Sequence, residues 1–454
     1  MKKRIGFIAM SGVRAHNAEL TKLGLTLPGF VERNKIIASL PSLGLLTLAG
    51  LTPDRFDVAY HEIADLRQTG DALPDEFDLV AISTFTAQLK EAFEVGDAYL
   101  ARGTPVVMGG ITVSALADEA LAHCTSVVVG EGEPLWPEVL HDFERGLLKP
   151  RYVLSPPDQF DLRDAPMPRF DLLDPAKYNR LTVQTSRGCP HSCEFCASSI
   201  LLTGRYKVKP VEKVVAEIQA IKRRWPQPFI EFADDNSFVQ RDHYKRLLRA
   251  LVKEGLHWFT EADVRVAEDD DLLGLMRDSG CRQVLIGLES LRPASLDGIE
   301  LRTNWKLRHQ DRYREAIAKI QSFGITVNGC FILGLDGDTP EVFDEVLRFV
   351  RESGLYEVQI TFLTPFPGTP LYERLEAEGR LLRPGAWELC TLFDINFTPR
   401  DMSVEELQRG FLGLGKQLYA AEETAARRRQ FTERLKSSPN FRRRAGGRDT
   451  ALAA

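Results

Sequence analysis

The sequence predicts an α/β protein in which an N-terminal Rossmann-like parallel sheet precedes a partial (β/α)6 TIM barrel and a helical C-terminal region. Three observations predict this fold class. Short apolar segments alternate with helical patterns in two separate series, which is the pattern of parallel sheets. A proline-rich stretch separates the two series. The 454 residues are also too many for one ordinary core, so more than one domain is expected.

The first series fills residues 1–148 and predicts a doubly wound sheet. Helical patterns at 43–51 and 88–101 separate the apolar segments. Gly109 and Gly110 follow one expected strand, and the residues 130–133, GEGE, follow the next. These positions are carboxyl ends of strands, where open α/β sheets bind ligands. The expected strands are residues 4–9, 56–61, 79–83, 105–108 and 126–129.

A linker is expected over residues 149–178. Six prolines lie between positions 150 and 175, and neither helices nor central strands tolerate them.

The second series predicts a barrel over residues 179–384, with helical patterns such as 211–225 and 340–353 between its strands. Six strands are two βα units short of a closed barrel, which indicates an open, partial one. A single helical segment over 404–426 is expected in the C-terminal region, 385–454. The expected barrel strands are residues 181–185, 229–233, 258–263, 283–288, 326–333 and 357–363.

Composition argues against several classes of protein. The net charge of −6 gives no reason to expect nucleic-acid binding, and no apolar run reaches the roughly 18 residues of a membrane span. The start, MKKRIGFIAM, indicates a buried strand rather than a signal peptide because its apolar stretch is short and contains Gly6. Seven cysteines, three of them within eight residues, indicate a metal site in a reducing cytoplasm rather than disulfides.

The C-terminus is strongly basic. From Arg427 to Arg448 there are eight Arg and one Lys, Lys436, against one acid, Glu433. We interpret this run as a solvated, partly disordered tail, and the alternative is contact with an anionic partner or a membrane surface.

The residues 185–196, TSRGCPHSCEFC, follow the first barrel strand and contain Cys189, Cys193 and Cys196. Three thiolates in one loop can hold a [4Fe–4S] cluster and leave one iron open for a small molecule. Zinc is the rival, but a closed zinc site needs four ligands and the loop offers only His191 as a fourth. We expect His191 to face solvent rather than to bind metal.

This loop, Cys-x3-Cys-x2-Cys with Phe195 before the last Cys, resembles that of the radical S-adenosylmethionine (SAM) superfamily. The resemblance implies that SAM chelates the open iron and is cleaved reductively to a 5′-deoxyadenosyl radical. It also implies SAM contacts at later strand ends. The residues carried over to SAM binding are Phe195, Asp234, Asp235, Arg265, Glu289, Ser290, Phe331 and Ile332. Asp234 and Asp235 could instead cap a helix, and Glu289 could form a surface ion pair. Cys124, Cys281, Cys330 and Cys390 lack ligand spacing and are expected to be buried small hydrophobes.

The N-terminal region is similar to the cobalamin-binding domains of radical SAM enzymes, on the residues 41–46, PSLGLL, and 129–133, VGEGE. With residues 365–372, PFPGTPLY, the resemblance covers about 1–400. The Asp-x-His-x-x-Gly loop that supplies a cobalt ligand in many cobalamin proteins is absent, and His16 lacks that context. Either cobalamin has no protein ligand on its lower face, or the domain is only a scaffold. The candidate cobalamin contacts are Arg14, Ser83, Thr84, Gly109, Gly110, Gly130 and Glu131, which equally suit another nucleotide-like ligand or tight turns.

We therefore expect a cytoplasmic, cobalamin-dependent radical SAM methylase of an unactivated carbon, without nucleic-acid partners. Its expected partners are a small-molecule, lipid or natural-product substrate and an electron donor such as flavodoxin or ferredoxin. One rival performs cyclisation, coupling or transfer of another SAM fragment, with cobalamin or only the scaffold. A second rival is an iron–sulfur electron-transfer or sensing protein. Asp394, Trp387 and Tyr419 are guesses at substrate contacts.

Overall fold

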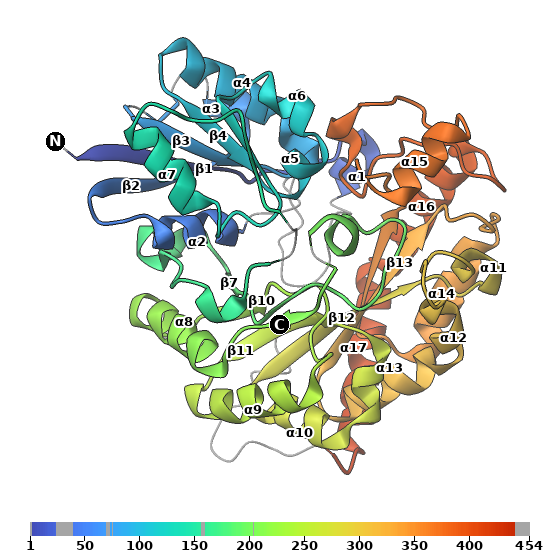
Figure 1. Cartoon of the computed structure of the whole chain (residues 1–454). Coiled ribbons are helices and arrows are strands. Elements are labelled where there is room, and N and C mark those ends of the chain that lie inside the picture. Colours follow the sequence, from blue (N-terminus) through green and yellow to red (C-terminus); the bar gives the residue numbers. More distant parts are fainter. Residues whose placement is uncertain are drawn as a thin grey trace. The chain divides into compact units, whose positions relative to one another are not determined.

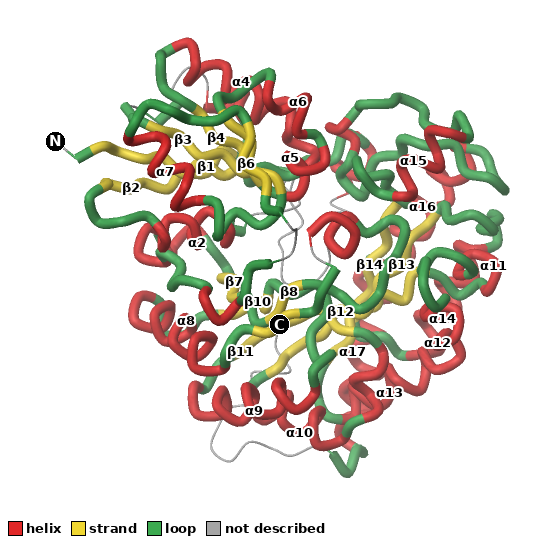
Figure 2. Tube along the Cα trace, in the orientation of Figure 1, coloured by secondary structure: helices red, strands yellow, loops and turns green. Residues whose placement is uncertain are grey.

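The computed structural model describes residues 2–23, 40–69, 73–74, 76–155, 159–202 and 204–440. These residues form two compact units. The first unit contains the elements from β1 to β10 together with Leu363–Thr398, and the second contains Ser237–Phe362 and the described residues from Pro399 onward. Figure 1 labels the helices and strands, and Figure 2 colours the chain by secondary structure.

The first unit is built on a six-stranded parallel sheet with the strand order β2-β1-β3-β4-β5-β6. The order reverses at β1, so that β2 lies on one side of it and β3 on the other. Such a reversal is the point at which open α/β sheets bind ligands. The strands are β1 (Lys3–Met10), β2 (Phe56–Ile63), β3 (Leu79–Ser83), β4 (Val106–Gly109), β5 (Ser126–Val129) and β6 (Arg151–Val153).

Helices cover both faces of this sheet (Figure 1). Alternate residues of β1 enter two different cores: Ile5 and Phe7 pack with α2 and α7, while Ile8 and Met10 pack with α4. A strand that is covered on both faces must be apolar throughout, which explains the unbroken buried run in β1. The helices are α1 (Ala18–Leu23), α2 (Leu43–Leu51), α3 (Leu66–Thr69), α4 (Leu89–Ala101), α5 (Ile111–Ala115), α6 (Ala117–Leu121) and α7 (Trp136–Glu144).

The rest of the first unit carries the cysteine loop. Strand β7 (Leu181–Val183) pairs in parallel with β10 (Phe229–Phe232). The short β8 (Ser186–Arg187) pairs antiparallel with β9 (Lys207–Val208). A π-helical turn, Ser198–Leu202, follows the last cysteine of the loop. The helices here are α8 (Val211–Arg224) and α15 (Pro370–Ala377).

The second unit contains four parallel strands in the order β14-β13-β12-β11. Its helices are amphipathic; α14, for example, buries Val342, Val346 and Val350 and ends at Gly354, which adopts the left-handed conformation. The elements are α9 (Arg241–Leu251), β11 (His257–Ala262), α10 (Asp270–Ser279), β12 (Cys281–Glu289), α11 (Pro293–Leu296), α12 (Trp305–His309), α13 (Tyr313–Ser322), β13 (Thr326–Leu333), α14 (Val342–Ser353), β14 (Glu357–Phe362), α16 (Val404–Leu418) and α17 (Ala421–Lys436).

The helix expected over 404–426 is two helices, α16 and α17, with extended backbone at Ala420. Arg427 is almost fully buried, and its guanidinium donates a hydrogen bond of 2.8 Å to the carbonyl oxygen of Leu418 at the end of α16. The break therefore places a cation where the helix has unpaired carbonyl groups. Within α17 the basic run is helical, so the expectation of disorder is wrong there, and the expectation of a solvated side chain is wrong for Arg427. Arg429, Arg434 and Lys436 are exposed, as expected of a solvated run. Residues 441–448 of that run lie outside the described residues.

The proline-rich stretch expected as a linker contributes a strand. Residues 151–153 form β6, which pairs with β5 at the edge of the first sheet. Edge strands tolerate nearby prolines because one side of the strand donates to no neighbour. Pro156 and Pro157 of the same stretch lie outside the described residues.

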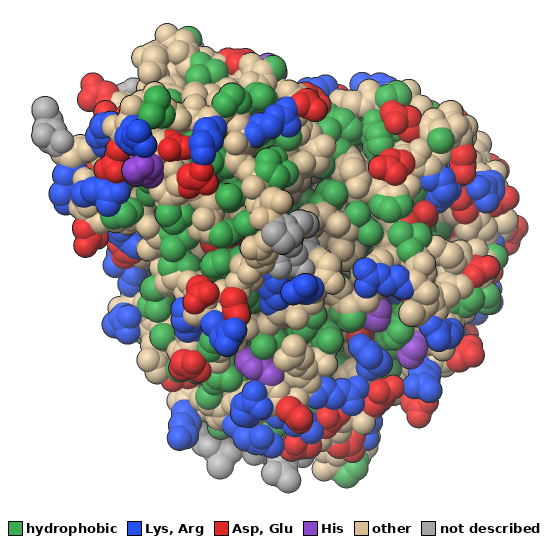
Figure 3. Space-filling model, viewed as in Figure 1, with side chains coloured by type: hydrophobic (Ala, Val, Ile, Leu, Met, Phe, Trp, Pro, Cys, Tyr) green, Lys and Arg blue, Asp and Glu red, His purple; other side chains and the backbone are tan. Residues whose placement is uncertain are grey.

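Acidic and basic side chains are interspersed over the face shown in Figure 3, in keeping with the small net charge. Within the described ranges, no helix combines the length and the apolar character that a bilayer crossing requires.

Candidate active site

Two aspartates that follow β10 hold the cysteine loop. The carboxylate of Asp234 accepts a hydrogen bond of 2.7 Å from the backbone N–H of Thr185. The carboxylate of Asp235 accepts one of 2.8 Å from the backbone N–H of Gly188 and another from the hydroxyl of Ser198. Asp235 thus bridges residues before and after the three cysteines. Both side chains, carried over as SAM contacts, fix the loop in this structure.

The thiols lie at different depths. Cys193 is buried, while Cys189 and Cys196 are half-buried. Burial raises the pKa of the Cys196 thiol, so metal binding at this position must displace a proton. The side-chain amide of Asn236 donates a hydrogen bond to the sulfur of Cys189 over 3.8 Å. His191 is buried at 8% exposure, so the expectation that it faces solvent is wrong.

The loop offers the donor set of a cluster. Cys189, Cys193 and Cys196 lie in one loop that is tethered by Asp234 and Asp235. A [4Fe–4S] cube with one open iron takes one thiolate at each of its other three irons, so these three cysteines suit three corners of a cube. Among the described residues, no three His, Cys, Asp or Glu side chains are grouped around the position of a single metal ion.

A cavity of about 200 Å³ lies at the carboxyl ends of β3, β4 and β5. Pockets that enclose a whole ligand usually measure roughly 300–1,000 Å³, so this cavity suits one end of a large ligand. Its lining includes five of the seven candidate cobalamin contacts: Ser83, Gly109, Gly110, Gly130 and Glu131.

Glycines shape the cavity wall. Gly110 and Gly130 have φ angles of 110° and 90°, which other residues rarely adopt. The hydroxyl of Ser114 accepts a hydrogen bond of 2.9 Å from the N–H of Gly130. Leu48 and Trp136 supply apolar surface in the same lining. The wall therefore combines exposed backbone with apolar side chains, as a nucleotide-like ligand requires.

A buried ion-pair network closes one side of the cavity. Arg187, two residues before Cys189, contacts Glu131 at 2.9 Å and Glu133 at 2.5 Å. Lys207 contacts Glu131 at 2.9 Å as well. Burial would raise the pKa of Glu133, but the charge and hydrogen bonds of Arg187 hold it below its ordinary value. Glu131 lines the cavity, yet its carboxylate already accepts bonds from both cations.

Two candidate cobalamin contacts are elsewhere: the lining of the cavity, as far as the chain is described, includes neither Arg14 nor Thr84. The Arg14 guanidinium donates to the carbonyl oxygen of Gly12 and pairs with Glu91. The hydroxyl of Thr84 donates to the carbonyl oxygen of Phe85. No sequence motif surrounds Arg14 or Thr84 that could have shown that these residues lie outside the cavity lining.

In the second unit, the two charged residues carried over to SAM binding are held by ion pairs. Arg265 forms a 2.9 Å ion pair with Asp263. Asp263 also caps the helical turn Val264–Glu268, which contains Arg265. Glu289 ends β12 and forms a buried 2.8 Å ion pair with Lys306. Both carboxylate–cation pairs lie at carboxyl ends of strands, the ligand-binding edge of parallel α/β folds.

The remaining candidates of this unit are buried. The hydroxyl of Ser290 accepts a hydrogen bond of 3.1 Å from the N–H of Arg292. The ring of Phe331 packs edge-on against Phe349 of α14, and Phe331 and Ile332 are both buried. In the first unit, Phe195 is half-buried.

The other cysteines and the guessed substrate contacts have structural surroundings. Cys124, Cys281 and Cys390 are buried, as predicted, while Cys330 is half-buried. The carboxylate of Asp394 accepts a hydrogen bond of 2.9 Å from the backbone N–H of His16. The indole N–H of Trp387 donates one of 3.1 Å to the carboxylate of Glu119. The hydroxyl of Tyr419 accepts one of 3.4 Å from the backbone N–H of Ile360.

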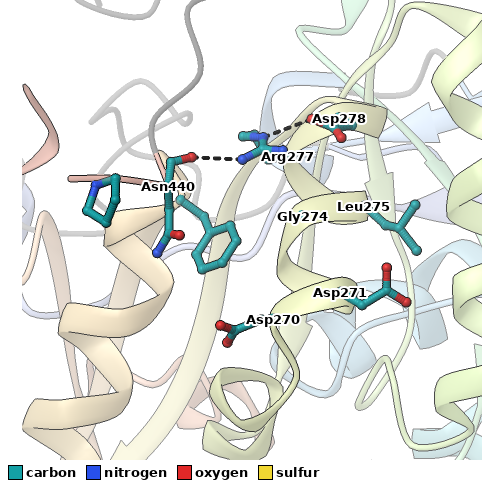
Figure 4. A pocket seen from close by; sticks show the side chains of 9 residues that line it. Asp270, Asp271, Gly274, Leu275, Arg277, Asp278 and Asn440 are labelled. Carbon is teal, nitrogen blue, oxygen red and sulfur yellow. Dashed lines mark hydrogen bonds and ion pairs between the residues drawn. The ribbon is translucent and has the colours of Figure 1, made fainter.

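A groove of about 280 Å³ beside α10 is rich in acidic side chains (Figure 4). Its charges are neutralised within the unit. Asp270 pairs with Lys319 at 2.8 Å and Asp271 with Lys245 at 3.1 Å. Arg277 donates to the carbonyl oxygen of Asn440. The groove therefore anchors the end of the described chain.

Sequence reasoning assigned no role to three residues of the site: Arg187, Asn236 and Lys306. Arg187 lies within the cysteine-loop motif and Asn236 directly follows Asp235, so their positions were a usable signal. Lys306 lies 17 residues beyond Glu289, and no spacing rule connects the two.

Comparison with known proteins identifies the family. The sequence profile described as "Radical SAM superfamily" matches residues 183–350, which contain the cysteine loop and the strand ends just described. The chain belongs to the radical SAM superfamily. A profile described as "Domain of unknown function (DUF4070)" matches residues 369–453 of this radical SAM enzyme.

Relatives of this radical SAM enzyme include methyltransferases. It is 29% identical over 385 residues to the bacteriochlorophyllide d C-12(1)-methyltransferase of Chlorobaculum tepidum, covering 83% of this chain and 82% of that protein. It is 30% identical over 365 residues to the hopanoid C-2 methylase of Rhodopseudomonas palustris, covering 76% and 66%. Its fold is similar, with a TM-score of 0.63 at 17% identity, to the radical SAM methyltransferase TsrM of Kitasatospora setae with cobalamin and a [4Fe–4S] cluster bound; the match covers 85% of this chain and 77% of that one.

Proposed function

We propose that this radical SAM enzyme is a cobalamin-dependent methylase of an unactivated carbon in a small-molecule substrate. One observation carries the proposal: a glycine-walled cavity and a tethered three-cysteine loop occur in the same compact unit, and Arg187 connects them. The methyltransferase relatives and the cobalamin bound to TsrM support the same reading.

When bound, the cluster would supply the electron that cleaves SAM, and cobalamin would carry the methyl group. Cys189, Cys193 and Cys196 would hold the cluster. Asp235 and Asn236 fix the loop and donate or accept the hydrogen bonds that orient it. In the cavity, apolar side chains such as Leu48 exclude water, while the backbone around Gly110 and Gly130 admits a closely bound ligand.

We also propose the domain division 1–148, 149–178, 179–384 and 385–454, with a partial six-stranded barrel in the third segment, and an external flavodoxin- or ferredoxin-type electron donor. The rival function, radical chemistry without methyl transfer, would need the same loop but no methyl carrier in the cavity.

The test is an anaerobic reconstitution with iron, sulfide and hydroxocobalamin. We expect the protein to retain cobalamin, and to form S-adenosylhomocysteine and 5′-deoxyadenosine when SAM, a reductant and substrate extracts are supplied. With methyl-labelled SAM the label should appear in a small-molecule product. A protein that forms 5′-deoxyadenosine but transfers no methyl label, whether or not it retains cobalamin, would support the rival instead.

A further inference from the structure

Glu289 has an unusual backbone conformation. It is not a glycine, yet its φ angle is 64°, and the register of β12 against β13 shifts between Gly287 and Glu289. A left-handed residue of this kind persists only where its surroundings hold it, and such positions gather at functional sites. The turned side chain lies over Gly287: a Cβ there would be 2.3 Å from an oxygen of Glu289.

Lys306 holds this arrangement. Its ammonium donates to the carbonyl oxygen of Gly287 at 2.6 Å and to Oε1 of Glu289 at 2.8 Å. Both charged side chains are only 9% exposed. A carboxylate offers about four acceptor positions, and among the described residues one of them is used, by Lys306. Glu289 therefore keeps acceptor capacity for a ligand while its charge is balanced.

The neighbouring Trp305 contacts the other charged candidate. The centroid of its ring lies 5.6 Å from the Cζ atom of Arg265. The same ring stacks on the ring of His309, with 4.2 Å between the two centroids. The indole face attracts the cation, and the guanidinium also pairs with Asp263 at 2.9 Å. Two consecutive residues at the start of α12 thus contact charged side chains from two strand ends, β11 and β12.

We propose that Trp305 and Lys306 are positioning residues that fix Arg265 and Glu289 for binding the carboxylate and the amino or ribose group of SAM. This inference rests on the proposed function, since it assumes that SAM binds at these strand ends. SAM carries both an amino group and a carboxylate, so its binding needs Glu289 and Arg265 to be held at a fixed separation. Trp305 and Lys306 are consecutive residues that contact both side chains, so they can fix this separation.

The experiment measures SAM affinity without turnover, by equilibrium dialysis of labelled SAM against the cluster-reconstituted enzyme in the absence of reductant. We expect Lys306→Met to weaken SAM binding at least tenfold, and Lys306→Arg, which keeps the charge, to recover part of the loss. Trp305→Leu should weaken binding several-fold more than Trp305→Phe, which keeps an aromatic face.

The matched control is a second buried Lys–Glu pair, Lys209 and Glu217, 2.7 Å apart and at most 4% exposed. Lys209→Met should lower the melting temperature and leave the SAM dissociation constant unchanged. If Lys306→Met lowers the melting temperature in the same way but binds SAM like the wild type, the pair is structural and the inference is overturned. If Lys306→Met does not fold, equal affinities of Trp305→Leu and Trp305→Phe overturn it. A wild-type enzyme that assembles its cluster but binds no SAM contradicts the proposed function itself.

Discussion

A substitution at Gly44 tests whether the cavity binds cobalamin. Gly44 lies in the first turn of α2 and lines the cavity, and a Cβ there would meet nothing within 4 Å. Gly44→Leu should therefore fold normally, because Leu is a better helix former than Gly by up to about 1 kcal/mol. Its four side-chain carbons would enter space that the ligand needs.

The expected loss follows from overpacking. Forcing extra carbon groups into a close-packed site costs about 1–3 kcal/mol, so cobalamin affinity should fall roughly 5- to 150-fold. The assay is spectrophotometric titration of the cluster-reconstituted protein with hydroxocobalamin, alongside thermal melting.

Gly413→Leu is the matched control. Gly413 is also a helical glycine, in α16, and a Cβ there would likewise meet nothing within 4 Å. It should melt at or above the wild-type temperature and keep its cobalamin affinity. If Gly44→Leu binds cobalamin as tightly as Gly413→Leu does, the cavity is not the cobalamin site.

Three further predictions concern the loop and a buried acid. Cys193→Ala should abolish the iron–sulfur absorbance near roughly 400 nm, whereas Cys281→Ala should keep it; zinc in the wild type, or a cluster that survives without Cys193, would refute the assignment. Asp235→Ala should lose the bonds on both sides of the loop, each worth about 1.5–3 kcal/mol, and release iron to a chelator faster than the wild type; equal rates would show that the tether is dispensable. Burial raises the pKa of Asp338 to about 6, so its neutral form stabilises the fold below pH 4 and that contribution is lost as pH rises through 6. The unfolding free energy of Asp338→Asn relative to wild type should then rise by roughly 2 kcal/mol between pH 4 and 7; a constant difference would contradict this.

The regular elements could be predicted from the sequence because their signals are local. Strand β5 and helix α2 have the predicted bounds, since apolar runs and helical periodicity are set by neighbouring residues. The break between α16 and α17 could not be predicted, because it depends on Arg427 reaching back to Leu418. An arginine in a basic run gives no local sign that it will be buried.

The same distinction explains the candidate site. The three cysteines lie within eight residues, so their spacing alone predicts that they belong to one site. Asp234 and Asp235 were placed at the right strand end, yet their contacts depend on which strand pairs with β10. That strand is β7, and the pairing brings both carboxylates against the backbone that leads into Cys189.

The function of a strand-end residue therefore depends on what its neighbours leave available. Asp235 is engaged twice by the cysteine loop, whereas Glu289, as far as the chain is described, is engaged by one lysine, which also fixes its turned backbone. A carboxylate whose acceptor positions serve the protein's own N–H groups stabilises a loop; one that is balanced by a single cation retains positions for a ligand. By this argument Glu289 is a better candidate for SAM recognition than either aspartate, although the resemblance carried all three over to SAM binding. The affinity of Lys306→Met for SAM decides whether that ranking holds.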